Sequence, residues 1–233
     1  MIGILSDAHG NFPAFDKAIN ILRREGATRF VFLGDAIGYL PTPLVLVAIQ
    51  RLGKDIDCIC GNHEDIFLKG IVDSERDLIY QHHGTRHQIN QVQLEFIKSW
   101  PVRSTKTFDI GSALFVHGSP LKPIYGYVYP NTDLADFEVE ERFVFMGHTH
   151  RPFMRQHLGT TFVNVGSCGL PRDYGTLGSV ALFDELTGNV RILRFDITQE
   201  TQMALASIGA VHSSIYSLLA RKTEEIIGEL IEI

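Results

Sequence analysis

The sequence predicts an α/β protein with two packed β-sheets, and two observations carry this prediction. In the N-terminal half, short apolar runs rich in Val, Ile and Phe alternate with segments of helical periodicity, as in parallel sheets whose strands are joined by helices. From residue 106 onward, strand-like runs follow one another with few helices between them. The alternation favours a first, parallel sheet, and the later run of strands favours a second, mixed sheet packed on it.

The N-terminal half begins with strand–helix units whose ends are recognisable. Asn11 can cap a helix that runs to about residue 25, where Gly26 supplies the stop. Thr42 with Pro43 can begin a second helix, which Gly53 closes. We expect parallel pairing and right-handed crossovers for the three strands that these helices connect. Those strands are expected at residues 2–5, 30–33 and 56–60.

Residues 64–100 have helical periodicity without strand signals, and we expect two or three helices there. The segment contains His82, His83 and His87. The last two are spaced i,i+4, which can suit zinc. No glutamate follows His83, and polar residues surround all three histidines, so we interpret them as part of a solvated helical face.

The second half is expected to be mainly β-structure, followed by a helical tail. Residues 186–189 form a hairpin turn between the last two strands. Residues 197–233 carry two apolar stripes, which either pack on the domain's own outer face or contact another copy of the chain. We see no internal repeat or linker, so we predict one domain over 1–196, with 197–233 as its helical tail. The strands are expected at residues 106–110, 113–116, 143–146, 161–165, 179–184 and 190–195.

Composition excludes several classes of protein. The 45% hydrophobic content is ample for a core, and the net charge of −6 without a Lys/Arg run weighs against binding long nucleic acids. No stretch approaches the length of a membrane span, and the N-terminus enters a strand without a signal-like segment, so we expect a soluble, cytoplasmic protein. Three cysteines, Cys58, Cys60 and Cys168, are interpreted as reduced core residues.

Five short polar clusters follow directly after predicted strands. A buried strand that ends in Asp, His or Asn places that side chain at the carboxyl edge of a sheet, where α/β folds build their sites. Any one of these residues alone would more often be a cap or a satisfied polar group, but together they predict a metal site. The clusters are Asp7-Ala8-His9, Gly34-Asp35, Gly61-Asn62-His63-Glu64, His117-Gly118 and Gly147-His148-Thr149-His150.

This ordered set, DxH, GD, GNH(D/E), H and GHxH over residues 7–150, resembles the calcineurin-like metallophosphoesterase superfamily. The resemblance implies an αββα sandwich, in which two facing mixed β-sheets are flanked by helices, with the site along one edge and the helical segment 64–100 beside it. It also implies two divalent transition-metal ions, manganese first, with iron, zinc, nickel or cobalt as alternatives, because every donor is oxygen or nitrogen. By the family pattern Asp35 bridges both metals, Asp7, His9 and His150 complete the first site, and Asn62, His117 and His148 complete the second.

The same resemblance implies a reaction, in which a hydroxide between the two metals attacks phosphorus in line. His63 matches the family's non-ligand histidine, which stabilises or protonates the leaving oxygen. Glu64 either orients His63 or faces solvent. Arg172 lies in a segment, 169–173, that resembles a loop near the site in bacterial members, and it contacts a substrate phosphate or forms a surface salt bridge. Tyr39 either stacks on a nucleobase or packs under the rim of the site.

The substrate class is narrowed by one departure from a family pattern. Gly34–Tyr39 lacks the arginine and second aspartate of the GDxVDRG motif of the Ser/Thr phosphoprotein phosphatases, and resembles instead the compact bacterial and archaeal phosphodiesterases. We therefore expect a small-molecule or nucleotide phosphoester as substrate, either a phosphodiester or a dinucleoside polyphosphate. The alternatives are a phosphomonoesterase, a protein phosphatase, a nuclease, or a non-catalytic scaffold that binds proteins, like the retromer subunit with this fold. The scaffold is disfavoured because every ligand position and His63 are retained.

Overall fold

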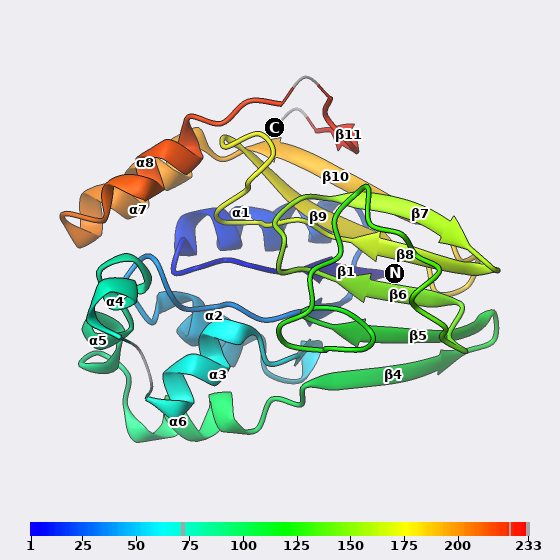
Figure 1. Cartoon of the computed structure of the whole chain (residues 1–233), viewed down its shortest axis with the longest axis horizontal. Helices are drawn as coiled ribbons and strands as arrows, with labels where there is room; N and C mark the ends of the chain where they lie inside the picture. The colour runs from blue at the N-terminus through cyan, green and yellow to red at the C-terminus, as the bar shows by residue number, and fades with distance from the viewer. Residues whose placement is uncertain (71–72, 224, 232–233) are drawn as a thin grey trace.

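The computed structural model describes residues 1–70, 73–223 and 225–231, and contains two β-sheets that pack face to face (Figure 1). The first sheet has the strand order β11-β10-β9-β1-β2-β3, and the second has the order β4-β5-β6-β8-β7. The predicted two-sheet α/β architecture with flanking helices is confirmed. The strands of the first sheet are β1 (Ile2–Leu5), β2 (Arg29–Phe32), β3 (Ile56–Cys58), β9 (Leu177–Phe183), β10 (Val190–Asp196) and β11 (Glu229–Leu230). Those of the second are β4 (Arg103–Phe108), β5 (Gly111–Val116), β6 (Phe143–Met146), β7 (Phe153–His157) and β8 (Thr160–Asn164).

The apolar strand residues explain why the sheets face each other. Ile4 and Val31 from the first sheet join Phe115 and Phe145 from the second in one buried cluster. In a strand, successive side chains point to opposite faces, so the alternate residues Leu5 and Phe32 join a second cluster under the helices. Each central strand of the first sheet is therefore buried on both faces, as its continuous apolar run predicted.

Two helices, α1 (Phe12–Arg24) and α2 (Leu44–Leu52), cover the outer face of the first sheet, and a short 3₁₀ turn, η1 (Gly53–Asp55), follows α2. The Asn11 side chain accepts a hydrogen bond from the backbone N–H of Ala14, which confirms the predicted cap of α1. Its amide also donates to the carbonyl of Gly169 and to Thr201 Oγ1. The cap of α1 thereby connects the N-terminal helix to the C-terminal part of the chain.

The segment 64–100 is helical as predicted, but it forms more and shorter helices than expected. Its described residues contain α3 (Asn62–Lys69), α4 (Ser74–Tyr80), α5 (His82–Arg86) and α6 (Gln91–Lys98). Gln81 has a φ of 56° and separates α4 from α5. A left-handed residue at this point turns the chain, so α5 starts in a new direction.

Three predictions for the second half were wrong in part. Strand β4 spans Arg103–Phe108 instead of 106–110, and β7 was not predicted, because only Phe153 of its five residues is buried and the apolar run is missing. The tail forms helices α7 (Thr198–Ile208) and α8 (Ser213–Leu219), but its last part is not helical. There β11 pairs with β10 in parallel, which places the second apolar stripe at the edge of the first sheet; residues 224, 232 and 233 of the tail lie outside the described residues. The division at residue 196 stays a prediction.

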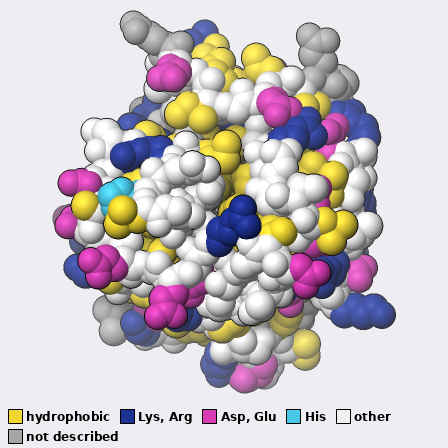
Figure 2. Space-filling model, turned by 90° about the vertical axis from the view of Figure 1, so that its right-hand side faces the viewer, with side chains coloured by type: hydrophobic (Ala, Val, Ile, Leu, Met, Phe, Trp, Pro, Cys, Tyr) yellow, Lys and Arg dark blue, Asp and Glu magenta, His cyan; other side chains and the backbone are white. Residues whose placement is uncertain are grey.

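The ends of the strands differ in character. The carboxyl ends of β1, β5 and β6 lie toward the helical side of the molecule, on the left of Figure 1, and β2 runs parallel to β1. The opposite end is viewed in Figure 2, where basic and acidic side chains are interspersed with hydrophobic ones. None of the described helices has the length and apolar character needed to cross a membrane.

Candidate metal centre

The predicted site residues converge at the carboxyl ends of five strands. Asp7 follows β1, Asp35 follows β2, Asn62 follows β3, His117 follows β5, and the segment with His148 follows β6. Parallel strands bring their carboxyl ends to one edge, so five segments far apart in the sequence meet there. All eight predicted metal and catalytic residues are buried: Asp7, His9, Asp35, Asn62, His63, His117, His148 and His150.

The backbone at these positions is strained. A positive φ costs a residue other than glycine roughly 1–3 kcal/mol, and such residues concentrate at functional sites. Among the eight non-glycine residues with positive φ in the described part of the chain, five are predicted metal ligands. Each lies where the chain turns sharply after a strand, which aims its side chain into the site. The five are Asp7, His9, Asp35, His148 and His150.

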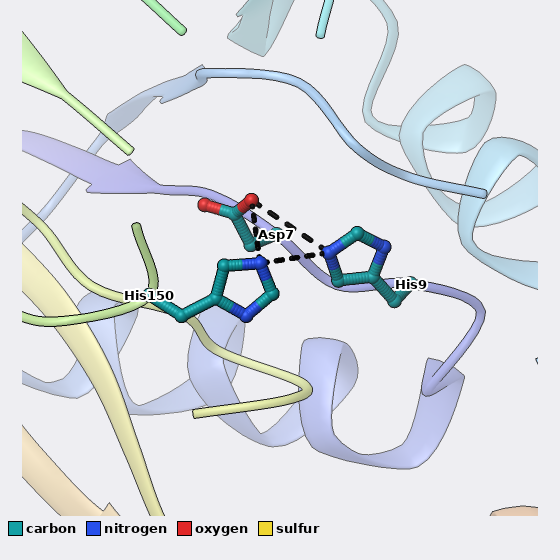
Figure 3. A group of neighbouring side chains, drawn as sticks. All are labelled: Asp7, His9 and His150. Carbon is teal, nitrogen blue, oxygen red and sulfur yellow. Dashed lines mark hydrogen bonds and ion pairs between the residues drawn. The ribbon is translucent and has the colours of Figure 1, made fainter. Parts of the chain in front are cut away.

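The first group of donors consists of Asp7, His9 and His150, whose side chains point toward one another in Figure 3. The Nδ1–H of His9 donates to the carbonyl of Ile37, and that of His150 donates to the carbonyl of Leu170. Each ring therefore presents its Nε2 lone pair to the other across 3.1 Å. Asp7 Oδ1 lies 3.3 Å from His150 Nε2 and has no hydrogen-bond partner among the described residues. Two lone pairs and a carboxylate oxygen that face one another fit a cation.

The second group is centred on His117. Its Nδ1–H donates to the carbonyl of Leu33 at 2.8 Å, so its Nε2 faces the site. That nitrogen lies 2.9 Å from Asn62 Oδ1 and 3.1 Å from His148 Nδ1. Asp35, His117 and His148 also form one of the groups able to hold a metal ion. Again the atoms that converge are acceptors, and a cation satisfies them together.

Asp35 lies between the two groups. Its Oδ2 is 3.7 Å from His9 Nε2 on one side and 3.4 Å from His117 Nε2 on the other. Its Oδ1 accepts a hydrogen bond from the backbone N–H of His63 at 2.9 Å, which fixes the orientation of the carboxylate. One carboxylate therefore contacts both donor groups.

The protonation states suit metal binding. Burial lowers the pKa of His148 to about 3 and that of His150 to about 4, so both are neutral near pH 7. Burial opposes ionisation of Asp7 and Asp35, but the facing imidazoles of His150 and His117 hold the pKa of both carboxyl groups below the usual range. Burial also opposes charge on His117, yet the Asp35 carboxylate raises its pKa to about 9. Without a metal, a proton on His117 occupies the place of a cation, and metal binding would release it.

The interpretation that Glu64 faces solvent is wrong, and its orienting of His63 stays a prediction. The side chain is fully buried, and its carboxylate accepts hydrogen bonds from the backbone N–H groups of Asp35, Ala36 and Gly61 at 2.7, 2.8 and 3.0 Å. Burial, followed by the neighbouring Asp35 charge, raises the pKa of Glu64 to about 7. Glu64 thus holds the turn that presents Asp35.

His82 is a site residue that sequence reasoning missed. We expected it on a solvated face, but it is buried, and its Nε2 lies 2.9 Å from Nδ1 of His63. The prediction is right for His83 and His87, which are exposed. The left-handed turn at Gln81 directs His82 inward, and a run of polar residues gives no signal of that turn.

Two further aromatic residues border the site. Tyr39 is buried and packs edge-on against His9, with ring centroids 4.7 Å apart. Of the two alternatives for Tyr39, the structure agrees with packing under the rim of the site. Arg172 donates from Nη2 to Tyr39 Oη at 2.7 Å, and no carboxylate of the described residues lies within salt-bridge distance of it. Its contact with substrate stays a prediction. Tyr127, which the sequence analysis did not single out, lies with its ring centroid 4.2 Å from that of His148.

Comparisons with known proteins agree with this geometry. Residues 1–188 match the family model of the calcineurin-like phosphoesterase superfamily domain. An uncharacterised protein, MJ0912, of Methanocaldococcus jannaschii is 27% identical over 220 residues, covering 84% of this chain and 87% of that protein. Phosphodiesterase YfcE of Escherichia coli strain K12 is 24% identical over 184 residues, covering 76% and 86% of the two chains. A metallophosphoesterase structure from Sphaerobacter thermophilus superposes with a TM-score of 0.75 at 25% identity, covering 94% of this chain and 97% of that one.

The family match and the buried His/Asp groups lead to the same assignment. The chain belongs to the calcineurin-like phosphoesterase superfamily and is a metal-dependent phosphoric ester hydrolase.

Proposed function

We propose that the protein is a dinuclear metallophosphoesterase that hydrolyses a phosphodiester or a dinucleoside polyphosphate of nucleotide size. The observation that carries this proposal is the position of Asp35, whose Oδ2 faces both His9 and His117. A carboxylate shared between two donor groups is what a pair of metal ions requires. The all-oxygen and nitrogen donor set favours manganese, with iron, zinc, nickel or cobalt as alternatives.

In this proposal each donor group holds one ion. Asp7, His9 and His150 would bind the first, and Asn62, His117 and His148 the second, with Asp35 shared between them. When bound, two divalent ions supply an activated water and neutralise charge on the phosphoryl oxygens. The backbone carbonyls of Ile37, Leu33 and Leu170 orient the imidazoles, as second contacts of metal-binding histidines do.

His63 is the proposed catalytic residue. Its backbone N–H donates to Asp35 Oδ1, and its ring lies 4.8 Å from that of His9, beside the shared carboxylate and the first donor group. His82 Nδ1 has no partner among the described residues, so a proton on His82 Nε2 that donates to His63 Nδ1 satisfies the pair. His63 then carries its own proton on Nε2, where it can stabilise or protonate the leaving oxygen of the ester. Arg172, within reach of Tyr39 at the rim, would contact a phosphate oxygen of the substrate.

The helical segment supports a small substrate. The Tyr39 backbone N–H donates to the carbonyl of Tyr80 at 2.8 Å, and the Tyr80 ring packs 4.6 Å from that of His63. Helix α4 is thereby attached to the rim of the site. A rim narrowed by α4 favours a nucleotide-sized ester over a phosphorylated protein loop.

The test is a metal-supplemented assay with bis(p-nitrophenyl) phosphate, p-nitrophenyl phosphate, diadenosine tetraphosphate and a phosphopeptide. We expect a transition metal, manganese first, to be required, and the highest kcat/KM for a diester or the dinucleoside polyphosphate. Asp35→Asn should abolish hydrolysis, whereas Asp55→Asn, which changes an exposed aspartate, should not. A phosphopeptide turned over more efficiently than both other classes, or full activity in Asp35→Asn, would refute the proposal.

A further inference from the structure

A pocket of about 420 Å³ opens beside the candidate metal centre. Its wall includes Tyr39 and Tyr80, which pack against His9 and His63, and Thr149, which lies between two predicted ligands. The volume lies in the range of small-molecule sites. The pocket and the metal centre therefore share a wall, and one ligand can reach both.

The polar lining of this pocket is basic. Arg151, Arg172 and Arg221 line it, and within the described part of the chain no carboxylate lies within salt-bridge distance of Arg151 or Arg172. Nε of Arg172 is buried and has no hydrogen-bond partner among the described residues. Arginines gathered without carboxylates in a chain of net charge −6 indicate an anionic ligand, and their forked donors suit phosphate.

An aromatic surface connects the metal centre with the pocket. Tyr127 packs against His148, and its ring is parallel to that of Tyr129, with an interplanar angle of 9° and centroids 5.9 Å apart. Tyr129 lines the pocket and lies under the Arg151 guanidinium at 5.9 Å. Both tyrosines are exposed, at 54% and 38%. Exposed parallel rings offer an aromatic face on which a nucleobase can stack.

The C-terminal helix completes the pocket. Arg221 lies two residues beyond the end of α8, and its backbone carbonyl accepts a hydrogen bond from the N–H of Gly175 at 2.9 Å. Helices α8 and α4 lie at the same end of the molecule in Figure 1, and both contribute residues to the lining. The tail thus has a place in the substrate site.

We propose that this basic pocket binds a non-scissile phosphate of a nucleoside polyphosphate substrate, whose base stacks on Tyr127 and Tyr129. The inference rests on the proposed function, because the scissile phosphate must lie at the metal centre. It selects dinucleoside polyphosphates over diesters with a single phosphate.

The test compares kcat/KM for diadenosine tetraphosphate with that for bis(p-nitrophenyl) phosphate, which has no second phosphate. Arg151→Gln and Arg221→Gln should each lower the ratio of the two values by about tenfold, mainly through KM for the tetraphosphate, because a charged hydrogen bond is lost. Arg29→Gln removes an equally charged, exposed side chain at the opposite end of β2 and should leave the ratio at the wild-type value. Arg151 and Arg221 are exposed, so their variants are expected to fold.

The outcomes separate the two proposals. An unchanged ratio in both pocket variants, or a wild-type enzyme that hydrolyses bis(p-nitrophenyl) phosphate but not the tetraphosphate, overturns the pocket assignment and leaves the proposed function standing. A wild-type enzyme that hydrolyses neither ester under any of the metals overturns the proposed function itself.

Discussion

The His63 ring lies against Gly38, a residue without a side chain. Gly38 has a φ of +92°, and a Cβ at this position would overlap Nδ1 of His63. The absence of a side chain at residue 38 therefore leaves room for the imidazole and for its contact with His82. Only glycine serves both needs at once, the positive φ and the close approach.

Gly38→Ala should displace His63 and lower kcat by at least about 10²-fold, the lower range of a lost general acid. Gly53→Ala is the matched control: Gly53 also has a positive φ, 56°, but a Cβ there meets nothing within 4 Å. Backbone strain should cost each variant roughly 1–2 kcal/mol of stability, and the overlap with His63 should add to the loss in Gly38→Ala. Steady-state kinetics and thermal melts distinguish the two effects, and equal activity in the two variants would show that Gly38 does not position His63.

His82→Gln should lower kcat roughly tenfold with little change in KM, because the amide can still donate to His63 Nδ1 but does not match the imidazole. His83→Gln, at an exposed position one residue along the chain, should behave as wild type. His82→Ala, which removes the donor, should lose more than His82→Gln. Metal content should stay at the wild-type level throughout. Higher activity in His82→Gln than in His82→Ala would show that the hydrogen bond to His63 matters, and not only the packing of residue 82. Equal activity in the two variants would contradict the positioning role of His82.

The histidines at 82, 83 and 87 also show which property of single residues could not be predicted from the sequence, namely the burial of His82. Strand-end residues such as Asp7 and Asp35 could be predicted, because a short apolar run fixes where each strand stops. His82 could not be told from His83, because its burial depends on one left-handed residue, Gln81. Glutamine is not among the residues that favour a positive φ, so the sequence gives no signal of this turn.

At the scale of elements, the loop with Arg172 is held to β10 by a buried ion pair. Arg194 is fully buried, and its two terminal nitrogens donate to Asp173 at 2.7 and 3.1 Å. It also donates to the carbonyls of Leu177 and Ile227. One side chain thus connects the loop, strand β10 and the tail before β11.

Asp173→Asn should destabilise the protein by about 3–5 kcal/mol, because it leaves the Arg194 charge buried without a counter-charge. Glu229→Gln removes a partner of Arg191 in an ion pair of similar length, 2.6 Å, at the protein surface. That control should cost at most about 1 kcal/mol. Urea denaturation measures both, and similar midpoints for the two variants would mean that the buried pair does not hold the loop.

The same elements explain the errors in the fold prediction. The central strands are apolar on both faces and were recognised, whereas β7 and β11 lie at sheet edges with few buried residues and were not. The second apolar stripe of the tail was predicted as a helix because its residues also fit helical spacing. Ile227 and Ile231 instead pack on the two hydrophobic cores beside β11. Tertiary contacts therefore determine the secondary structure of this segment, which hydrophobic periodicity alone does not distinguish.

At the scale of the whole molecule, the site couples stability to pH. In the metal-free protein the pKa of His117 is raised to about 9, so its ion pair with Asp35 stabilises the fold fully below pH 6.5, and this stability is lost as the pH rises through 9. His148 and His150 act in the opposite direction. Their pKa values in the folded protein are about 3 and 4, below the ordinary value of 6.5. As the pH falls below 6.5, these histidines take up protons in the unfolded chain but not yet in the folded one, so stability is lost.

The metal-free protein should therefore melt at the highest temperature near pH 6.5. Between pH 6.5 and 9 its Tm should fall, while the difference between the manganese-loaded and metal-free Tm should widen, because the metal replaces the proton on His117. His117→Gln should remove both trends over this range. Thermal melts of chelator-treated and reloaded protein test this, and a metal-induced Tm shift that stays constant from pH 6.5 to 9 would contradict it.

The most direct test of a dinuclear site around Asp35 is the number of metal ions per chain. Elemental analysis of manganese-loaded, gel-filtered protein should give about two ions for the wild type and about one for His150→Gln and for His148→Gln, since each variant damages one donor group. Both variants should also lose hydrolysis of bis(p-nitrophenyl) phosphate. One ion per chain in a fully active wild type, or an unchanged content in both variants, would contradict the two-metal site.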